Sequence, residues 1–335
     1  MTVIILILGI LFGLTLQYAS LNKYNTISGM ATLENLTVAK AIAVAVGLGA
    51  VLINIEIGLG VASYHVKPLI VGGIVIGGIL FGAGMAILGY CPGTLAISLG
   101  EGSLDALAGI VGALLGGLTY TLLLPSISGI LGPNLGALSL QTAVENKLVF
   151  FILVFIIAAI FIGLAFWMNT KEEKTNHRWV VAGIALAVLN VVVFAHVVTD
   201  RVIGASTTYP YLADLLTGTT QNDYFAKIQT PGHWELLFLS GAFLAGLVGS
   251  LIKKEFKIKL IHENWEKYKG TSAIKRVIWA FVGGFILLLG ARMAGGCTSG
   301  HVLSGGMQLA FSSLLFAVVV FASLLITGKL FYKKS

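Results

Sequence analysis

Long apolar runs separated by short polar connections make up almost the whole chain. Spanning the hydrocarbon core of a bilayer takes about 20 mostly apolar residues. Nine runs reach about this length, at residues 2–20, 37–60, 68–88, 104–124, 148–168, 179–199, 233–252, 273–291 and 307–328. The pattern predicts an all-α polytopic membrane protein, with residues 1–335 as a single integral membrane domain. No basic segment precedes the first run, so we interpret it as a retained span and not as a cleaved signal.

The composition supports this class of protein. Hydrophobic residues make up 57% of the chain and charged residues only 10%, whereas soluble domains carry about 25% charged residues. The 42 glycines are typical of closely packed and broken membrane helices. The net charge of +7 comes from lysines in short segments between the apolar runs, without any nucleic-acid motif. We therefore expect a lipid bilayer as the surroundings, and neither nucleic acid nor a cofactor as a partner.

The basic connections predict the orientation, because lysine and arginine favour cytosolic loops. Residues 253–270, 169–178 and the C-terminal tail are basic, whereas 125–146 and 200–232 carry little net positive charge. We therefore expect a multi-pass protein of the cell (inner, cytoplasmic) membrane, with its N-terminus outside and its C-terminus cytoplasmic. The 200–232 connection would lie outside, as a vestibule or lid.

This topology predicts two inverted halves. Residues 1–124 and 179–328 would be the halves and 148–168 the span that connects them, so that the two cysteine segments enter from opposite sides. The cysteines are 206 residues apart, and aligning them also superposes Gly84 on Gly290, Gly89 on Gly295 and Gly100 on Gly306. Inverted repeats of this kind frame a substrate site at the midplane, built from broken helices.

The first cysteine segment reads "GYCPGT", from Gly89 to Thr94. Pro92 and Gly93 follow Cys91 directly and should end one helix and open another, since proline suits the first turn of a helix. The six residues that follow, "LAISLG", are too short to span. The segment therefore predicts a half-helix that begins near Pro92.

The second segment reads "GGCTSGH". Its glycines (Gly295, Gly296 and Gly300) should break the eighth apolar run around Cys297. Thr298 or Ser299 would then cap a short helix through "GHVLSGG". Each of the two cysteines would thus lie at the N-terminus of a half-helix, where free N–H groups and the positive end of the helix dipole favour an anion.

The polar side chains near the cysteines are neutral or basic, which predicts an anionic substrate. They are Thr94, Ser98, Thr298, Ser299, Arg292 and His301. A thiol is a weak, soft donor suited to a large polarizable sulfur, and it must remain neutral, because a thiolate would repel an anion. Burial raises a thiol pKa, whereas a helix N-terminus and an arginine lower it.

The charged residues at membrane depth allow more than one interpretation. Arg292 lies where a charge is costly and normally faces a cavity or a partner, so it either faces the substrate, pairs with a carboxylate such as Glu56, or snorkels. His301 either donates to an anion or caps a carbonyl. We interpret Lys67 as an interfacial anchor and Glu56 as a group that pairs helices.

The stretches "GYCPGT" and "GARMAGGCTSGHVLSG" resemble the YeeE/YedE family of sulfur-compound transporters, which includes bacterial thiosulfate uptake proteins. The resemblance covers nearly the whole chain. It implies nine spans, short helices that point inward from both sides, and an hourglass with the cysteines along its axis. It also implies that Cys91 and Cys297 relay thiosulfate or a similar sulfur anion by S–H to sulfur hydrogen bonds. A separate cytosolic sulfur-carrier protein of the TusA type is the partner that the family implies.

The chain departs from this family at one position. Members usually carry a further cysteine after the first span, where this sequence has Asn22 in "LQYASLNKYNTISG". An asparagine can donate an N–H to an anion but offers no thiol. The departure leaves room for a different sulfur species or a selenium species as substrate.

Two other functions remain open from the residues. A soft-metal transporter would use the sulfur ligands Cys91, Cys297, Met85 and Met293, although Arg292 would oppose a cation. A membrane thiol oxidoreductase needs paired thiols, and the chain has no C-x-x-C. The absence of this motif also argues against a zinc site. Walker motifs are absent as well. We therefore predict a transporter and not an enzyme, with no metal site.

Overall fold

The computed structural model describes residues 1–172 and 176–333 of the chain. Parts of the basic 169–178 connection and of the C-terminal tail, which the orientation prediction used, lie outside the described residues. The described elements are helices: α1 Thr2–Tyr18, α2 Tyr24–Ala31, α3 Thr37–Gly58, α4 Val71–Leu88, α5 Pro92–Gly100, α6 Leu104–Leu131, α7 Leu140–Ala143, α8 Lys147–Asn169, α9 Arg178–Phe194, α10 Thr208–Thr217, α11 Asp223–Ile252, α12 Glu263–Lys269, α13 Ala273–Met293, η1 Thr298–Gly305 and α14 Phe311–Phe331.

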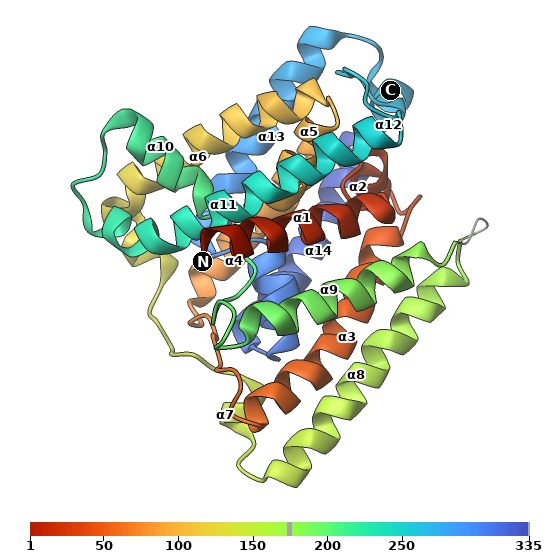
Figure 1. The fold of residues 1–335 in the computed structure, drawn as a ribbon. Coiled ribbons are helices and arrows are strands. Elements are labelled where there is room, and N and C mark those ends of the chain that lie inside the picture. The colour runs from red at the N-terminus through yellow and green to blue at the C-terminus, as the bar shows by residue number, and fades with distance from the viewer. Residues whose placement is uncertain (173–175, 334–335) are drawn as a thin grey trace.

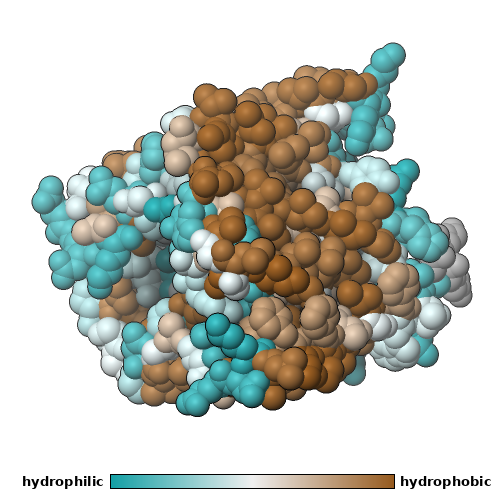
Figure 2. Space-filling view, turned by 60° about the horizontal axis from the view of Figure 1, so that its bottom comes forward, coloured by the Kyte–Doolittle hydropathy of each residue, from teal (hydrophilic) through white to brown (hydrophobic). Residues whose placement is uncertain are grey.

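The apolar runs form the long helices, and this confirms an all-α polytopic membrane protein. Seven of the described helical segments are long and apolar enough to cross a membrane, and α1 and α9 are shorter apolar helices. Figure 2 shows a broad hydrophobic surface with hydrophilic residues on either side. Such a surface suits lipid, because no water is needed to satisfy a helical backbone.

Two of the predicted spans are longer in the structure than the sequence indicated. α6 continues past Pro125 to Leu131, and α11 begins at Asp223 and contains Pro231. Membrane helices tolerate an internal proline, because neighbouring groups compensate the lost backbone hydrogen bond. The 200–232 connection is therefore largely helical, comprising α10 and the first turns of α11.

The helices form two groups that meet at the broken segments. α3 packs between α8 and α9 on one side of the molecule, and α4 and α13 pack together with α6 and α14 on the other. α8 lies at the edge, against α3 (Figure 1). α1 packs along α11, and α10 lies against both α6 and α11.

The packing partners recur in a reciprocal pattern. α1 packs on α11 and α9 packs on α3, while α4 packs on α14 and α13 packs on α6. The short helix α5 lies against α11, and the short helix η1 lies against α3. In these three pairs of contacts the early and late members are exchanged.

α4 and α13 cross each other directly on glycines. A methyl group added at Gly77 would lie 2.5 Å from the carbonyl oxygen of Gly290, and one added at Gly290 would lie 2.5 Å from that of Gly77. Gly84 and Gly283 repeat the contact, since a methyl group at Gly84 would lie 2.8 Å from the Gly283 oxygen. Small residues let membrane helices approach this closely.

Candidate functional site

The first cysteine segment forms the predicted break. α4 ends at Leu88, and Gly89 has φ +77°, the left-handed conformation that favours glycine. Cys91 is the N-cap of α5, with Pro92 in its first turn. The Thr94 hydroxyl oxygen accepts from the Cys91 backbone N–H at 2.9 Å, and it lies 3.5 Å from the Cys91 sulfur.

The second cysteine segment repeats this geometry. Gly295 has φ +77° after the end of α13, and Cys297 is the N-cap of η1. The prediction that Thr298 or Ser299 caps the helix is wrong, because Thr298 already belongs to the first turn and Cys297 precedes it. η1 is a π-helix, a wider coil often found at functional sites. The Ser299 hydroxyl lies 3.2 Å from the Cys297 sulfur.

The two half-helix N-termini meet at one small cavity of about 70 Å³. Its polar lining comes from both segments, with Cys91, Thr94, Thr298 and Ser299, and the rest is mostly apolar and includes Met85. About 10–15 Å³ of such space holds one water, so the cavity has room for a few waters or one small anion. Cys297 itself is buried beside the cavity, with 1% of its surface exposed.

Arg292 faces hydroxyl groups and not Glu56. Its Nε donates to the Tyr224 hydroxyl at 2.7 Å, and its Nη1 lies 3.2 Å from the hydroxyls of Ser206 and Thr207. Glu56 is buried, and its Oε2 has no hydrogen-bond partner. The guanidinium therefore lies beside hydroxyl groups that an anionic ligand could share.

The 200–232 connection covers the site. Glu235 on α11 caps the N-terminus of α10, accepting at Oε2 from the backbone N–H groups of Thr207 at 2.5 Å and Thr208 at 3.3 Å. The Tyr209 hydroxyl donates to the carbonyl oxygen of Pro92 at 2.7 Å. α10 is thus fixed both to α11 and to the start of α5. The sequence offered no signal for this role beyond the aromatic residues of the connection.

His301 is a buried group whose hydrogen bonds hold the second break together. Its Nε2 lies 2.8 Å from the Ala294 carbonyl oxygen and its Nδ1 lies 3.0 Å from the Ser313 hydroxyl. The ring stacks on Phe316. Of the two interpretations of His301, the geometry favours the one in which it caps a carbonyl, since both ring nitrogens already have partners.

Lys67 lies at the second break, although the sequence suggested only an interfacial anchor. Its ammonium lies 2.5 Å from the Gly295 carbonyl oxygen. A methyl group added at Gly296 would lie 2.1 Å from the same nitrogen, and one at Gly300 would lie 3.2 Å from it. These glycines therefore make room for the lysine over the N-terminus of η1. A lysine directly before Pro68 carries no signal of such a long-range contact.

Asn22 lies at the other end of α5 from Cys91. The Ser98 hydroxyl donates to the Asn22 carbonyl oxygen at 2.7 Å, and the Asn22 side-chain amide donates to Glu101 at 2.8 Å. Glu101 also accepts from Gln17 at 2.9 Å and from Lys23 at 2.7 Å. The donor that the sequence assigned to an anion is therefore bound to a carboxylate of the protein.

A polar cavity of about 230 Å³ lies at this end of α5. Its lining includes Ser98 and Glu101 together with Lys23, Lys257 and Lys259. It lies on the side of the lysine-rich 253–270 connection. The half-helix α5 thus links the small central cavity with a polar, lysine-lined one.

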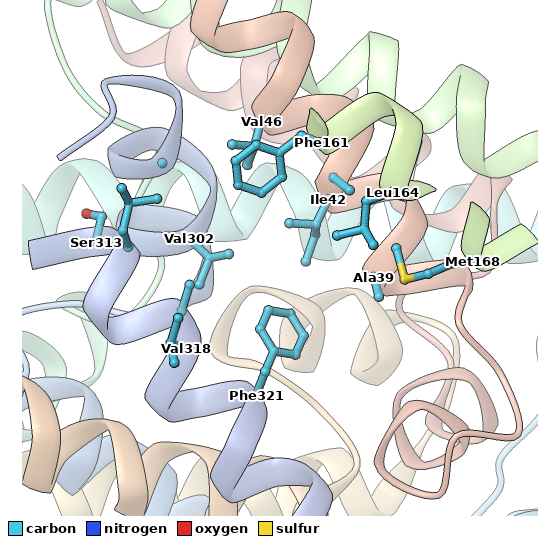
Figure 3. Close-up of a pocket in the computed structure, with 14 residues that line it drawn as sticks. Ala39, Ile42, Val46, Phe161, Leu164, Met168, Val302, Ser313, Val318 and Phe321 are labelled. Carbon is cyan, nitrogen blue, oxygen red and sulfur yellow. The ribbon is translucent and has the colours of Figure 1, made fainter. Parts of the chain in front are cut away.

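A larger, apolar cavity does not share this chemistry. This cavity, of about 490 Å³, lies between α3 and α8 on one side and η1 and α14 on the other, and apolar side chains line almost all of it (Figure 3). Its polar residue Ser313 already bonds to His301. Burying an anion in an apolar cavity without donors is costly, so this cavity does not suit an anion.

A metal centre finds no support in the part of the chain that the structure describes. No group of three or more histidine, cysteine, aspartate or glutamate residues there could hold an ion. Both cysteines are free thiols. The sulfur atoms of Cys91 and Met85 do line the same cavity, but hydroxyl groups complete its polar lining.

Apolar helices surrounding two helix breaks that meet in the interior define a multi-pass membrane transporter. A family model described as "Sulphur transport" matches residues 24–326, so the chain belongs to this family, the YeeE/YedE family that the cysteine motifs indicated. The chain is 26% identical over 342 residues to the thiosulfate transporter TsuA of Spirochaeta thermophila, covering 93% of this chain and 94% of that relative. These comparisons confirm a transporter of sulfur-containing anions and not an enzyme.

Proposed function

We propose that the protein imports thiosulfate, or a closely related sulfur anion, past the thiols of Cys91 and Cys297. The observation that carries the proposal is the central cavity, where the N-termini of α5 and η1 contribute Cys91, Thr94, Thr298 and Ser299. Helix N-termini offer unpaired N–H groups and the positive end of a dipole to an anion. The name of the relative from Spirochaeta thermophila supports thiosulfate as the substrate.

The cysteines suit a relay because they bind weakly. A thiol is a weaker donor than a hydroxyl, so a polarizable sulfur atom is held loosely enough to move on. Thr94 and Ser299 lie beside the two sulfur atoms, at 3.5 Å from that of Cys91 and 3.2 Å from that of Cys297. In this proposal the hydroxyls orient the thiols and share the oxygen atoms of the anion, while the thiols contact its sulfur.

The proposed orientation places the lysine-rich end of the bundle on the cytoplasmic side of the cell membrane. The N-terminus then lies outside and the C-terminus inside. Residues 1–124 and 179–328 form two inverted halves in this proposal, and residues 148–168 connect them. The exchange of packing partners and the glycine crossing of α4 and α13 support the two halves. An anion would enter on the side of Lys67 and Arg292 and leave on the side of Glu101.

Uptake of labelled thiosulfate in cells without importers of their own tests the proposal. We expect uptake with the wild type, and none above background with Cys91→Ala or Cys297→Ala at equal expression. Cys297→Ser shows whether any small donor suffices. Ser128→Ala is the matched control, because this exposed hydroxyl bonds only within α6. Alanine variants that transport like the wild type would exclude a thiol relay.

Competition distinguishes the substrate from its relatives. Because Asn22 replaces the cysteine of related transporters, other sulfur oxoanions and selenium oxoanions belong in the same assay. Thiosulfate should compete most strongly. If a selenium anion competes better at equal concentration, the anion relay stands but thiosulfate is not its main substrate.

A cytosolic sulfur-carrier protein of the TusA type is the proposed partner at the inner end. The polar cavity has a rim with Lys23, Lys257 and Lys259 beside Glu101 and Glu255, and these lysines would attract an acidic surface or an anionic sulfur group. Co-purification of a TusA-type protein with the wild type, lost when Lys257 and Lys259 are both changed to glutamate, would support this partner. Equal recovery with both forms would contradict the proposed docking at this rim.

A further inference from the structure

Lys67 covers the approach to Cys297. It lies in the connection between α3 and α4, and its ammonium donates to the Gly295 carbonyl oxygen at 2.5 Å. The same nitrogen lies close to Gly296 and Gly300, which flank Cys297. Cys297 beneath it is 1% exposed. A single long side chain therefore lies over the N-terminus of η1.

The ammonium has no carboxylate within ion-pair distance among residues 1–172 and 176–333. Its electrostatic neighbours are Cys297, Glu235, which already caps α10, and Arg292, which repels it and lies three residues before Gly295. The positive charges of Lys67 and Arg292 repel each other, which raises the free energy of the protein without an anion. An anion between Lys67 and Arg292 would offset their mutual repulsion.

We propose that Lys67 is the first residue to bind the incoming anion, and that it closes the outer route to Cys297 while no anion is present. The inference rests on the proposed function, because it takes the substrate to be an anion that arrives at this end. In the empty protein the ammonium donates to Gly295. When an anion binds between Lys67 and Arg292, the ammonium donates to the anion instead and moves away from the glycines above Cys297.

A lysine suits this role better than an arginine. Its ammonium is a compact charge on a flexible four-carbon chain with rotatable donors. It can therefore exchange one acceptor for another by rotating its side chain. Arg292 is held by hydroxyls of Tyr224, Ser206 and Thr207, so it provides the fixed charge of the pair and Lys67 the mobile one.

Thiol labelling measures the closure directly. In a Cys91→Ser background Cys297 is the one remaining cysteine, and a membrane-impermeant thiol reagent is applied to intact cells from outside. We expect slow labelling of Cys297 with Lys67, and labelling about tenfold faster with Lys67→Met, because a hydrogen bond from a charged donor is lost. Lys67→Arg keeps the charge and the donors, so it should label slowly.

Thiosulfate uptake by the protein with both cysteines present measures whether Lys67 binds the anion. Lys67→Met should raise the KM for thiosulfate about tenfold, and Lys67→Arg should restore most of it. Lys227→Met is the matched control in both assays, because Lys227 is an exposed lysine in the first turns of α11, at the same end of the bundle. If Lys67→Met does not reach the membrane, Lys67→Gln replaces it in the uptake assay.

The outcomes separate this inference from the proposed function. Unchanged labelling and unchanged KM in Lys67→Met, with cysteine-dependent uptake intact, would overturn the role of Lys67 and leave the thiol relay standing. Faster labelling in Lys67→Met together with no thiosulfate uptake by the wild type would support the closure while overturning the proposed substrate.

Discussion

The guanidinium of Arg276 on α13 lies 2.5 Å from the carboxylate of Asp105 on α6, and both side chains are fully buried. The same nitrogen donates to the carbonyl oxygen of Leu88 at 2.7 Å. Leu88 is the last residue of α4 and lies three positions before Cys91. The ion pair therefore fixes the place where α4 ends and the first cysteine segment begins.

The second cysteine segment is held by a related contact from the other part of the chain. Lys67 precedes α4 and bonds to Gly295, two positions before Cys297, just as Arg276 near the start of α13 bonds to Leu88. Each break is thus held by a cation from the opposite part of the sequence. The difference is that Arg276 has a buried carboxylate partner, whereas Lys67 has no carboxylate within ion-pair distance among the described residues.

Removing the charge of Arg276 should strongly destabilise the protein. Arg276→Met removes both guanidinium donors from the Asp105 carboxylate and leaves it only His262 and the Tyr90 hydroxyl. Removing one partner of a buried ion pair costs about 3–5 kcal/mol. Thermal unfolding in detergent should show a clearly lower Tm, and the additional change Asp105→Asn should recover part of it. Lys275→Met is the control, since Lys275 is exposed on the same helix. A Tm of Arg276→Met equal to that of the control would contradict the structural role of the pair.

The glycine crossing of α4 and α13 should not accept a methyl group. In Gly290→Ala the added carbon would lie 2.5 Å from backbone atoms of Gly77 and Phe81, so the helices must separate at a cost of about 1–3 kcal/mol. Gly163→Ala on α8 meets nothing within 4 Å and should leave the Tm unchanged or raise it. The comparison isolates packing from helix propensity, because both changes add the same methyl group to a helix.

The packing at the end of α5 opposite Cys91 should depend on the neutrality of Asn22. Asn22→Asp would place a second carboxylate where the amide now donates to Glu101 at 2.8 Å, and burying like charges costs at least about 2 kcal/mol. We expect a lower Tm and less uptake. Asn25→Asp makes the same change beside the exposed Glu263, where water screens the charges, and should have little effect. Similar losses in both variants would show that burial is not the cause.

Thiosulfate uptake should weaken as the external pH rises through about 8. Burial and the neighbouring Arg292 lower the pKa of Lys67 to about 8, so the ammonium is charged below this pH and neutral above it. Because the anion binds the charged form, the KM should rise between pH 7 and pH 9. Glu235, Cys297 and His301 also face this ammonium.

The variant Lys67→Arg distinguishes the ionisation of Lys67 from that of the groups around it. The arginine stays charged across the whole range, so the KM of this variant should be nearly constant between pH 7 and pH 9. A rise in KM that persists in Lys67→Arg would assign the pH dependence to a group other than Lys67.

The helix breaks at the two cysteines could be predicted from the sequence, because residues adjacent to them in the chain determine them. Pro92 after Cys91 and the glycines before Cys297 indicated two breaks, and both cysteines lie at helix N-termini in the structure. The predicted spans 104–124 and 233–252 were too short, because α6 continues past Pro125 to Leu131 and α11 begins at Asp223, before Pro231. Proline restricts its own backbone, but only the surrounding helices decide whether a helix continues through it.

Contacts between distant segments could not be predicted in this way. The sequence suggested an anchor at Lys67 and a substrate donor at Asn22, yet Lys67 bonds to Gly295 and Asn22 bonds to Glu101. Each pair joins residues far apart in the chain, and no local pattern marks which partner a long polar side chain will reach.

By itself the sequence determined the class of the protein, the approximate spans and the position of both cysteines at a break, because hydrophobic length and the backbone limits of proline and glycine act within a few residues. The tertiary structure decided which polar groups surround the anion path. It brought the two breaks to one cavity, bound the Lys67 ammonium to the Gly295 carbonyl oxygen and bound the Asn22 amide to Glu101. Such choices depend on helix packing and on satisfying buried charges, which are properties of the assembled bundle and not of any single segment.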